Sequence, residues 1–197
     1  MTTVVGVGGF AAAIAGHLDA QLVTDADALA AAAAHGCVVI VPDTHGTIAE
    51  VVAIDDGAWD EQVGAALEQT VRAFQQAYAA LRLEGGAIVL VVPSVGIAGA
   101  PGLVPLCTLT EGARALAKSA ARQWTGDGVV TNTIAVPVEL MHPAAAGAAR
   151  HLAPPVAGGH DQVLSGVAST ITHLMTPGSR AIVGQTLTID GGTVMAP

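Results

Sequence analysis

The chain has 197 residues, of which 16 are acidic and 7 are lysine or arginine, giving a formal net charge of −9. This acidic balance excludes nucleic acid and anionic membrane surfaces as partners. Hydrophobic residues make up 52% of the chain, aromatic residues 3% and charged residues 12%. This composition predicts a core of Ala, Val, Leu and Ile and excludes disorder. The length fits a single domain, 1–197.

The mean hydropathy of +0.59 raises the question of a membrane span. The longest apolar runs, 10–15 and 29–34, are too short and too rich in alanine to cross a bilayer. The start Met-Thr-Thr-Val lacks the basic region of a secretory signal, so we expect a cytoplasmic protein. Cys37 and Cys107 have no metal-ligand spacing and are interpreted as small core residues.

Short β-branched runs alternate with longer alanine-rich stretches along the chain. We predict strands at 3–7, 21–24, 37–41, 87–92, 129–135 and 181–189. Helices are expected at 10–18, 25–34, 59–83, 104–124 and 161–175, and 141–160 reads as a long loop with room for a short helix. The predicted fold is α/β: a three-layer, Rossmann-like, doubly wound parallel sheet of about six strands, shortened in its N-terminal half.

The first predicted strand runs into a glycine turn. Gly6-Val7-Gly8-Gly9-Phe10-Ala11 fits the G-x-G-x-x-A fingerprint of a dinucleotide-binding turn, and the helix after it could accept a phosphate at its N-terminus. Asp25 follows the second strand, where a ribose-binding acid is expected. Gly6, Gly8 and Asp25 are therefore the candidate cofactor contacts. The alternative is that the glycines only form a tight turn between strand and helix.

From residue 59 onward, several segments resemble the short-chain dehydrogenase/reductase family in the family's own order. The strings are Trp59-Asp60-Glu61-Gln62-Val63, Gly85-Gly86-Ala87-Ile88-Val89, Gly99-Ala100-Pro101-Gly102, Arg114-Ala115-Leu116-Ala117-Lys118-Ser119, Thr131-Asn132-Thr133-Ile134-Ala135 and Val183-Gly184-Gln185-Thr186-Leu187-Thr188-Ile189-Asp190-Gly191-Gly192. The resemblance covers the C-terminal two-thirds of the chain. It implies a Rossmann-like fold and carbonyl reduction or alcohol oxidation with NAD or NADP.

The resemblance also implies four catalytic side chains, namely a proton-donating tyrosine, a lysine one helical turn later, a serine and an asparagine. Aligned without gaps, these serine, tyrosine, lysine and asparagine positions fall on Pro93, Leu106, Thr110 and Ala66. A shift by one residue gives Ser94, Cys107 and Glu111, which restores only the serine.

Counting residues gives the same result without an alignment. Tyr78 is the only tyrosine and Lys118 the only lysine, and they lie too far apart for a Y-x-x-x-K motif. Cys107 is the one candidate substitute donor, and it would need an activating cation. We therefore predict no catalytic residue of the family type.

The N-terminal third departs further from the family. One βα unit is missing before the third strand, Pro42-Asp43-Thr44-His45 replaces the family's Asn-Asn-Ala-Gly, and Val136-Pro137 replaces its Pro-Gly. We predict no bound cofactor, and leave weak NAD(P) binding at Gly6, Gly8 and Asp25 as the alternative.

Asp43 and His45 follow a strand at the edge where α/β proteins bind ligands, which suits acid-base or metal chemistry; the alternative is a solvated loop pair. His142, His151 and His160 lie in the predicted loop without H-x-H or H-x-x-x-H spacing, so no metal site is predicted.

Two functions remain open. The first is a non-catalytic subunit, a dimer or tetramer of this chain or a complex with a catalytically complete family member. Its predicted contact is the alanine-rich side of helices 59–83 and 104–124, with Ala65, Ala66, Ala73, Ala77, Ala80, Ala113, Ala117, Ala120 and Ala121. The second is an enzyme or ligand-binding protein that uses the same crevice through Gly6, Asp43 and His45.

Overall fold

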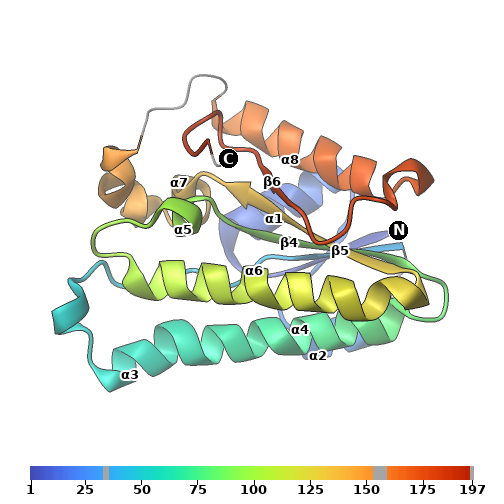
Figure 1. Ribbon diagram of the computed structural model, residues 1–197, viewed down its shortest axis with the longest axis horizontal. Helices are drawn as coiled ribbons and strands as arrows, with labels where there is room; N and C mark the ends of the chain where they lie inside the picture. Colours follow the sequence, from blue (N-terminus) through green and yellow to red (C-terminus); the bar gives the residue numbers. More distant parts are fainter. Residues whose placement is uncertain (33–35, 153–158, 196–197) are drawn as a thin grey trace.

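The computed structural model describes residues 1–32, 36–152 and 159–195, and Figure 1 shows a sheet covered by helices on both faces. The strands are β1 (Thr2–Val5), β2 (Gln21–Val23), β3 (Gly36–Ile40), β4 (Gly86–Pro93), β5 (Val129–Val136) and β6 (Thr186–Thr188). They pair in the order β2-β1-β3-β4-β5-β6, and every pairing is parallel. The predicted α/β architecture with six strands is confirmed.

Helices α2 (Ala26–Ala31), α4 (Ala66–Leu81) and α6 (Val104–Trp124) cover one face of the sheet. Short pieces lead into α4: the 3-10 turn η1 (Val51–Ala53), α3 (Asp56–Trp59) and the π-helical turn η2 (Asp60–Ala65). The predicted helix 59–83 therefore exists as a composite. Its first part is wound more loosely than the residue pattern indicates.

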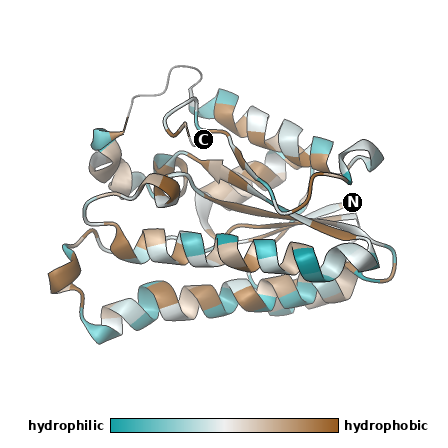
Figure 2. Cartoon of the chain, in the orientation of Figure 1, coloured by the Kyte–Doolittle hydropathy of each residue, from teal (hydrophilic) through white to brown (hydrophobic). Residues whose placement is uncertain are grey.

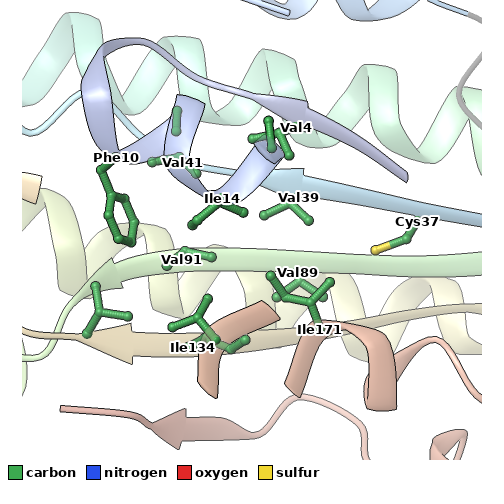
Figure 3. Packing of buried hydrophobic residues seen from close by; sticks show 14 of the residues in the cluster. Val4, Phe10, Ile14, Cys37, Val39, Val41, Val89, Val91, Ile134 and Ile171 are labelled. Atoms are coloured by element: carbon green, nitrogen blue, oxygen red, sulfur yellow. The ribbon is translucent and has the colours of Figure 1, made fainter. Parts of the chain in front are cut away.

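Helices α1 (Gly8–Leu18) and α8 (His160–Leu174) cover the other face. Figure 3 shows Phe10 and Ile14 of α1 and Ile171 of α8 packed against strand residues such as Val39 and Val89. Cys37 lies in this core, where burial raises the pKa of its thiol to about 12. The interpretation of Cys37 as a small core residue agrees with this placement.

The alanine-rich sides of α4 and α6 pack inside the chain. Ala73, Ala77, Ala113, Ala117 and Ala120 belong to the core cluster between these helices and the sheet, and Ala66 and Ala121 are buried as well. The predicted contact surface between subunits is therefore wrong for these seven residues. Small residues permit close packing on a sheet as well as on another chain, and here the sheet occupies them. A glutamate at Ala117 would enter the core rather than a subunit interface.

Three boundaries differ from the predictions. The last strand is limited to β6 at Thr186–Thr188, because residues 181–185 hold only turns and irregular backbone. The predicted loop 141–160 contains the end of α7 (Val138–Met141) and the 3-10 segment η4 (Pro143–His151), while 153–158 lie outside the described residues. The predicted helix 25–34 ends at Ala31, and 33–34 also lie outside the described residues.

In the described part of the chain, no helix is long and apolar enough to span a membrane.

Candidate functional site

The candidate site lies at the carboxyl edge of the sheet, where strand order reverses. β1 lies between β2 and β3, so the chain leaves β1 toward one side and returns to the other. Parallel sheets bind ligands in the crevice that this reversal opens. Gly6 follows β1, Asp25 follows β2 and Asp43 follows β3, so the fold brings all three to one edge.

Gly6 and Gly8 have different physical reasons to be glycine. A Cβ at Gly6 would lie 2.8 Å from the carbonyl oxygen of Val41 and 2.9 Å from its Cβ, so the turn passes too close to the end of β3 for any side chain. Gly8 has a φ of +83°, which favours glycine, and its missing side chain faces the His45 ring. Close packing of the turn against β3 is therefore a sufficient reason for glycine at position 6.

The N-terminus of α1 is open. Its N-cap is Val7, which has no polar side-chain atom, and the first turn contains no acidic residue. A Cβ built at Gly9 would have no heavy atom within 4 Å. The N–H groups of the first turn therefore face space in which an anion would be favourable.

Asp25 serves as the N-cap of α2. Its Oδ1 accepts a 2.8 Å hydrogen bond from the backbone N–H of Ala28, and its Oδ2 accepts a 3.0 Å bond from the Thr24 hydroxyl. The Ala28 bond is the main cause that lowers the pKa of this exposed carboxyl, and the Thr24 bond adds to it. Both oxygens are thus already engaged locally, and a ribose hydroxyl would compete with these partners.

Asp43 and His45 are hydrogen-bonded to each other. Asp43 Oδ1 pairs with His45 Nδ1 and also accepts the backbone N–H of His45 at 3.0 Å. Behind them, Nε2 of the buried His142 lies 3.1 Å from the Gly46 carbonyl oxygen, and the Thr44 hydroxyl donates to the Met141 carbonyl oxygen at 3.5 Å. Nδ1 of His45 is therefore occupied by the carboxylate, which leaves Nε2 as the nitrogen available to a ligand.

Three hollows surround the Asp43 side chain. One of about 450 Å³ contains Gly6, Asp25, Asp27 and Arg72 among its lining residues. A second of about 320 Å³ lies over Gly8, Gly9 and His45, and a third of about 350 Å³ extends from His45 toward Gln62 and Gln69. The structure therefore brings Gly6 and Asp25 into one hollow and places Gly8 in the next one.

The region beyond β4, around the start of α6, is packed with apolar side chains, whereas beyond β5 Leu140, Met141 and Pro143 line the hollow of about 320 Å³. A cluster of apolar side chains, which we call the Leu106 cluster, joins the short helix α5 (Val95–Ala98), the start of α6 and α7; its buried members are Val95, Leu103, Leu106, Val138 and Ala145. The cavity beside it lies between Leu103, Leu106, Leu109 and His142 on one side and residues 44–47 and Gln62 on the other, and it has a volume of only about 10 Å³. A space of that size holds about one water molecule.

A family model described as enoyl-(acyl carrier protein) reductase matches residues 11–194, nearly the whole described chain. The chain belongs to the short-chain dehydrogenase/reductase family. The matched segment begins beyond Gly6 and Gly8 and includes Asp25.

Curated relatives support the same family at lower coverage. The diacetyl reductases forming (S)-acetoin from Staphylococcus aureus strains Mu50, MW2 and N315 are each 29% identical to the chain over 122 residues. The match takes in 55% of this chain and 47% of each relative, so the chain spans about half the length of these relatives.

The four positions to which the gapless family resemblance assigns catalysis are all buried. Pro93 ends β4, Ala66 begins α4, and Leu106 is a member of the Leu106 cluster. Thr110 is 1% exposed and donates its hydroxyl to the Leu106 carbonyl oxygen at 2.7 Å.

Cys107 is half-buried beside this cluster, with its Sγ 3.9 Å from the Val95 carbonyl oxygen. Burial is the main cause that raises the pKa of its thiol, and the carboxylate of Glu111 raises it further. Arg114, the cation that could have activated the thiol, is held by Glu111 instead, with Nη1 2.7 Å from Oε2. The thiol therefore keeps its proton at neutral pH.

The single tyrosine lies at the other end of the molecule. Tyr78, near the end of α4, donates a 2.7 Å hydrogen bond to Asp127 and stacks on Trp124 with ring centroids 4.6 Å apart. The bond to Asp127 is the main cause that raises the pKa of the phenol. Tyr78 thus joins α4 to the turn before β5, and Lys118 is exposed on α6.

The histidines of the predicted loop do not converge. Nε2 of His142 lies by Gly46, Nε2 of His151 lies 2.9 Å from the Gly99 carbonyl oxygen, and His160 begins α8. Within the described ranges, no group of three or more His, Cys, Asp or Glu side chains is arranged to hold a metal ion.

A dinucleotide fits this chain only in part. The glycine turn and the open N-terminus of α1 suit a phosphate, and the hollow with Gly6 and Asp25 has room for an adenosine. On the side of the Leu106 cluster the cavity holds only about one water molecule, and the remaining room lies in the hollow of about 320 Å³ between Gly8 and Met141.

Three residues that contribute to the site were not predicted from the sequence. Arg72 of α4 lines the hollow of about 450 Å³, while its Nη2 lies 2.7 Å from Glu68 Oε1. His142 and Thr44 join the β3 edge to α7 across almost a hundred residues of sequence. The Glu68–Arg72 spacing indicates a helix pair, but nothing in it points to the crevice.

Proposed function

We propose that this member of the family has lost nicotinamide-dependent carbonyl reduction and acts as a non-catalytic subunit. The single observation that carries the proposal is the Leu106 cluster. It supports the proposal because Leu106, at the position where the family resemblance expects the phenol, is packed among apolar side chains beside a cavity of about 10 Å³.

The chemistry supports the same conclusion. Carbonyl reduction needs an acid that protonates the carbonyl oxygen, and loss of such a proton transfer typically costs a factor of about 10² to 10⁴ in rate. Leu106 and Thr110 stand at the positions of the phenol and the ammonium group. Cys107 is the remaining candidate acid, and burial and Glu111 disfavour its thiolate, the form left after proton transfer.

A turnover assay tests the loss of activity. Purified chain is mixed with NADH or NADPH and with diacetyl, other small ketones or a 3-oxoacyl thioester, and the absorbance of the reduced cofactor is followed. We expect no rate above the blank. A rate proportional to protein concentration, abolished in Cys107→Ser and retained in Cys37→Ala, would reject the proposal and identify the substitute donor.

The role as a subunit requires an assembly, either of this chain with itself or with a catalytically complete relative. Small family domains that have no chemistry of their own still present folded surfaces to a partner. Light scattering of the chain alone, and then mixed with such a relative, tests this role. A monomer in both samples at micromolar concentration would contradict it.

Ligand binding in the crevice is the second candidate function. The observation that favours it is that three hollows meet at Asp43, two of which also border His45, while Nδ1 of His45 pairs with the Asp43 carboxylate and leaves Nε2 available. Calorimetry with NADH and NADPH tests it, with Gly8→Val as the control that blocks the turn. A dissociation constant in the low micromolar range that Gly8→Val abolishes would favour this function over that of a subunit.

A further inference from the structure

Large apolar side chains are exposed on one short segment that follows β3. Ile48 is 45% exposed, Val51 61%, Val52 87% and Trp59 37%. We call these four residues the 48–59 patch. In the described residues, the other large apolar side chains with comparable exposure are Met1, Val7, Leu22, Leu83 and Met195, which are spread over the ends of the chain and separate elements. Exposed apolar residues that gather in one place mark interaction surfaces.

Hydrogen bonds hold the patch in an ordered conformation. The Ala49 N–H donates to the Gly102 carbonyl oxygen at 3.0 Å, and Ile48 packs so closely on Gly102 that a Cβ there would lie 2.7 Å from its Cγ2. Asp55 caps α3 by accepting the Ala58 N–H at 2.8 Å. Figure 2 shows η1, with Val51 and Val52, as an apolar segment at the edge of the molecule, away from the sheet. The segment is thus fixed by its backbone while its apolar side chains face solvent.

Exposed carboxylates alternate with the patch residues along the chain and follow directly after them. These five exposed acidic residues are Glu50, Asp55, Asp56, Asp60 and Glu61. In the part of the chain that the structure describes, none of them has a Lys, Arg or His partner within ion-pair distance. No lysine or arginine precedes Arg72 in the sequence, so the segment itself supplies no compensating cation.

The negative charge of these five carboxylates limits which kind of partner can bind the patch. A two-fold dimer through the patch would place the same carboxylates against each other, because both copies contribute the same surface. An anionic bilayer or a nucleic acid would be repelled for the same reason. A protein surface with an apolar centre and a Lys or Arg border would bury Val51, Val52 and Trp59 and neutralise the border.

We propose that the 48–59 patch is the docking surface for a different protein that presents an apolar surface bordered by lysine and arginine. This proposal rests on the proposed function, because it names the surface through which the non-catalytic subunit meets its partner. Trp59 is the central aromatic contact, and the five carboxylates select the partner by charge.

The fluorescence of Trp59 reports whether a partner covers the patch. The chain contains two tryptophans, so Trp124→Phe in the full chain leaves Trp59 as the only indole. The probe is a synthetic amphipathic helix with leucine on one face and lysine on the other, and its matched control has glutamate in place of every lysine. We expect the lysine peptide to shift Trp59 emission to shorter wavelength in a saturable manner, with weaker binding at about 0.5 M salt. The glutamate peptide should leave the emission unchanged.

Substitutions in the patch test whether the lysine peptide binds there. Val51→Ser with Val52→Ser should weaken the lysine peptide by at least about tenfold, and Glu50→Gln with Asp56→Asn should weaken it and reduce its salt dependence. Leu83→Ser removes an equally exposed apolar side chain at the far end of α4 and should change nothing. Thermal unfolding of each variant confirms that it is folded.

Three outcomes would overturn the proposal. These are equal binding of the lysine and glutamate peptides, binding of neither, and a wild-type dimer in light scattering that Val51→Ser with Val52→Ser converts to monomer. The last outcome would assign the patch to a second copy of this chain. The turnover assay runs on the same samples: a measured rate would reject the proposed function, while the peptide titration separately accepts or rejects the docking surface.

Discussion

The edge after β1, β2 and β3 and the region after β4 are two parts of one crevice that differ in how they are packed. The first is open, with three hollows around Asp43 and an uncapped helix N-terminus. The second is closed by the Leu106 cluster. The open edge depends on backbone geometry, and Gly6 is needed there for packing whether or not a ligand binds. In the closed region, catalysis would require polar side chains. The apolar side chains that stand there stabilise the fold by their burial.

The largest effect is expected from opening the closed region. Leu106→Ala removes a buried side chain beside the existing cavity and should lower the free energy of unfolding by about 2–4 kcal/mol. Val7→Ala, at the open edge, is the matched control and should change it by less than about 0.5 kcal/mol. Urea denaturation measures both. Equal effects of the two substitutions would show that the Leu106 cluster is not a packed core.

Next in size is a pair of glycine substitutions at the open edge. Gly6→Ala forces a Cβ against the Val41 backbone and should destabilise the fold by about 1–3 kcal/mol. Gly9→Ala places its methyl in free space within α1 and should stabilise it by about 0.4–1 kcal/mol. Thermal unfolding compares them. If both variants gain stability, the contact between the turn and β3 is not as close as described.

The smallest effect concerns Asp25 and its dependence on pH. Because the hydrogen bond from Ala28 lowers the pKa of this carboxyl, the ionised form stabilises the fold above the ordinary value of 3.8, and the stabilisation is lost as pH falls through the lower folded-state pKa. Asp25→Ala should lower the urea midpoint at neutral pH and flatten this part of the acid profile. Asp25→Asn keeps a good N-cap and should retain the neutral midpoint while losing the pH dependence. A wild-type acid profile in Asp25→Asn would contradict the assignment.

Strong local patterns predicted most of the fold. Helix α6 begins and ends at the predicted residues, because Pro105 near its start and Gly126 after its end delimit an uninterrupted pattern. The adjacency of Gly6, Asp25 and Asp43 also follows from sequence, since the carboxyl ends of parallel strands share one edge. The π-helical turn η2 and the short β6 were not predicted, because hydrophobic periodicity does not report how tightly a turn is wound or where pairing stops.

The parts of the site that escaped prediction depend on distant contacts. His142 reaches Gly46 from α7, and the Leu106 cluster gathers residues from α5, α6 and α7. The alanine faces of α4 and α6 were assigned to a subunit contact because a small side chain indicates close packing without indicating against what. The sequence does identify the absence of a Y-x-x-x-K motif, since that needs only a count of tyrosine and lysine.

The central claim is that the edge after β1 is open to a phosphate while the region around the Leu106 cluster is closed. Its most direct test is a calorimetric comparison of ADP-ribose with NADH. The two molecules share the adenosine, the pyrophosphate and the second ribose, and only NADH has the nicotinamide ring. We predict equal affinities for the two, both weak, because the cavity of about 10 Å³ beside the Leu106 cluster is too small for the ring. NADH binding tighter than ADP-ribose by about tenfold or more would show a formed nicotinamide site and contradict this prediction.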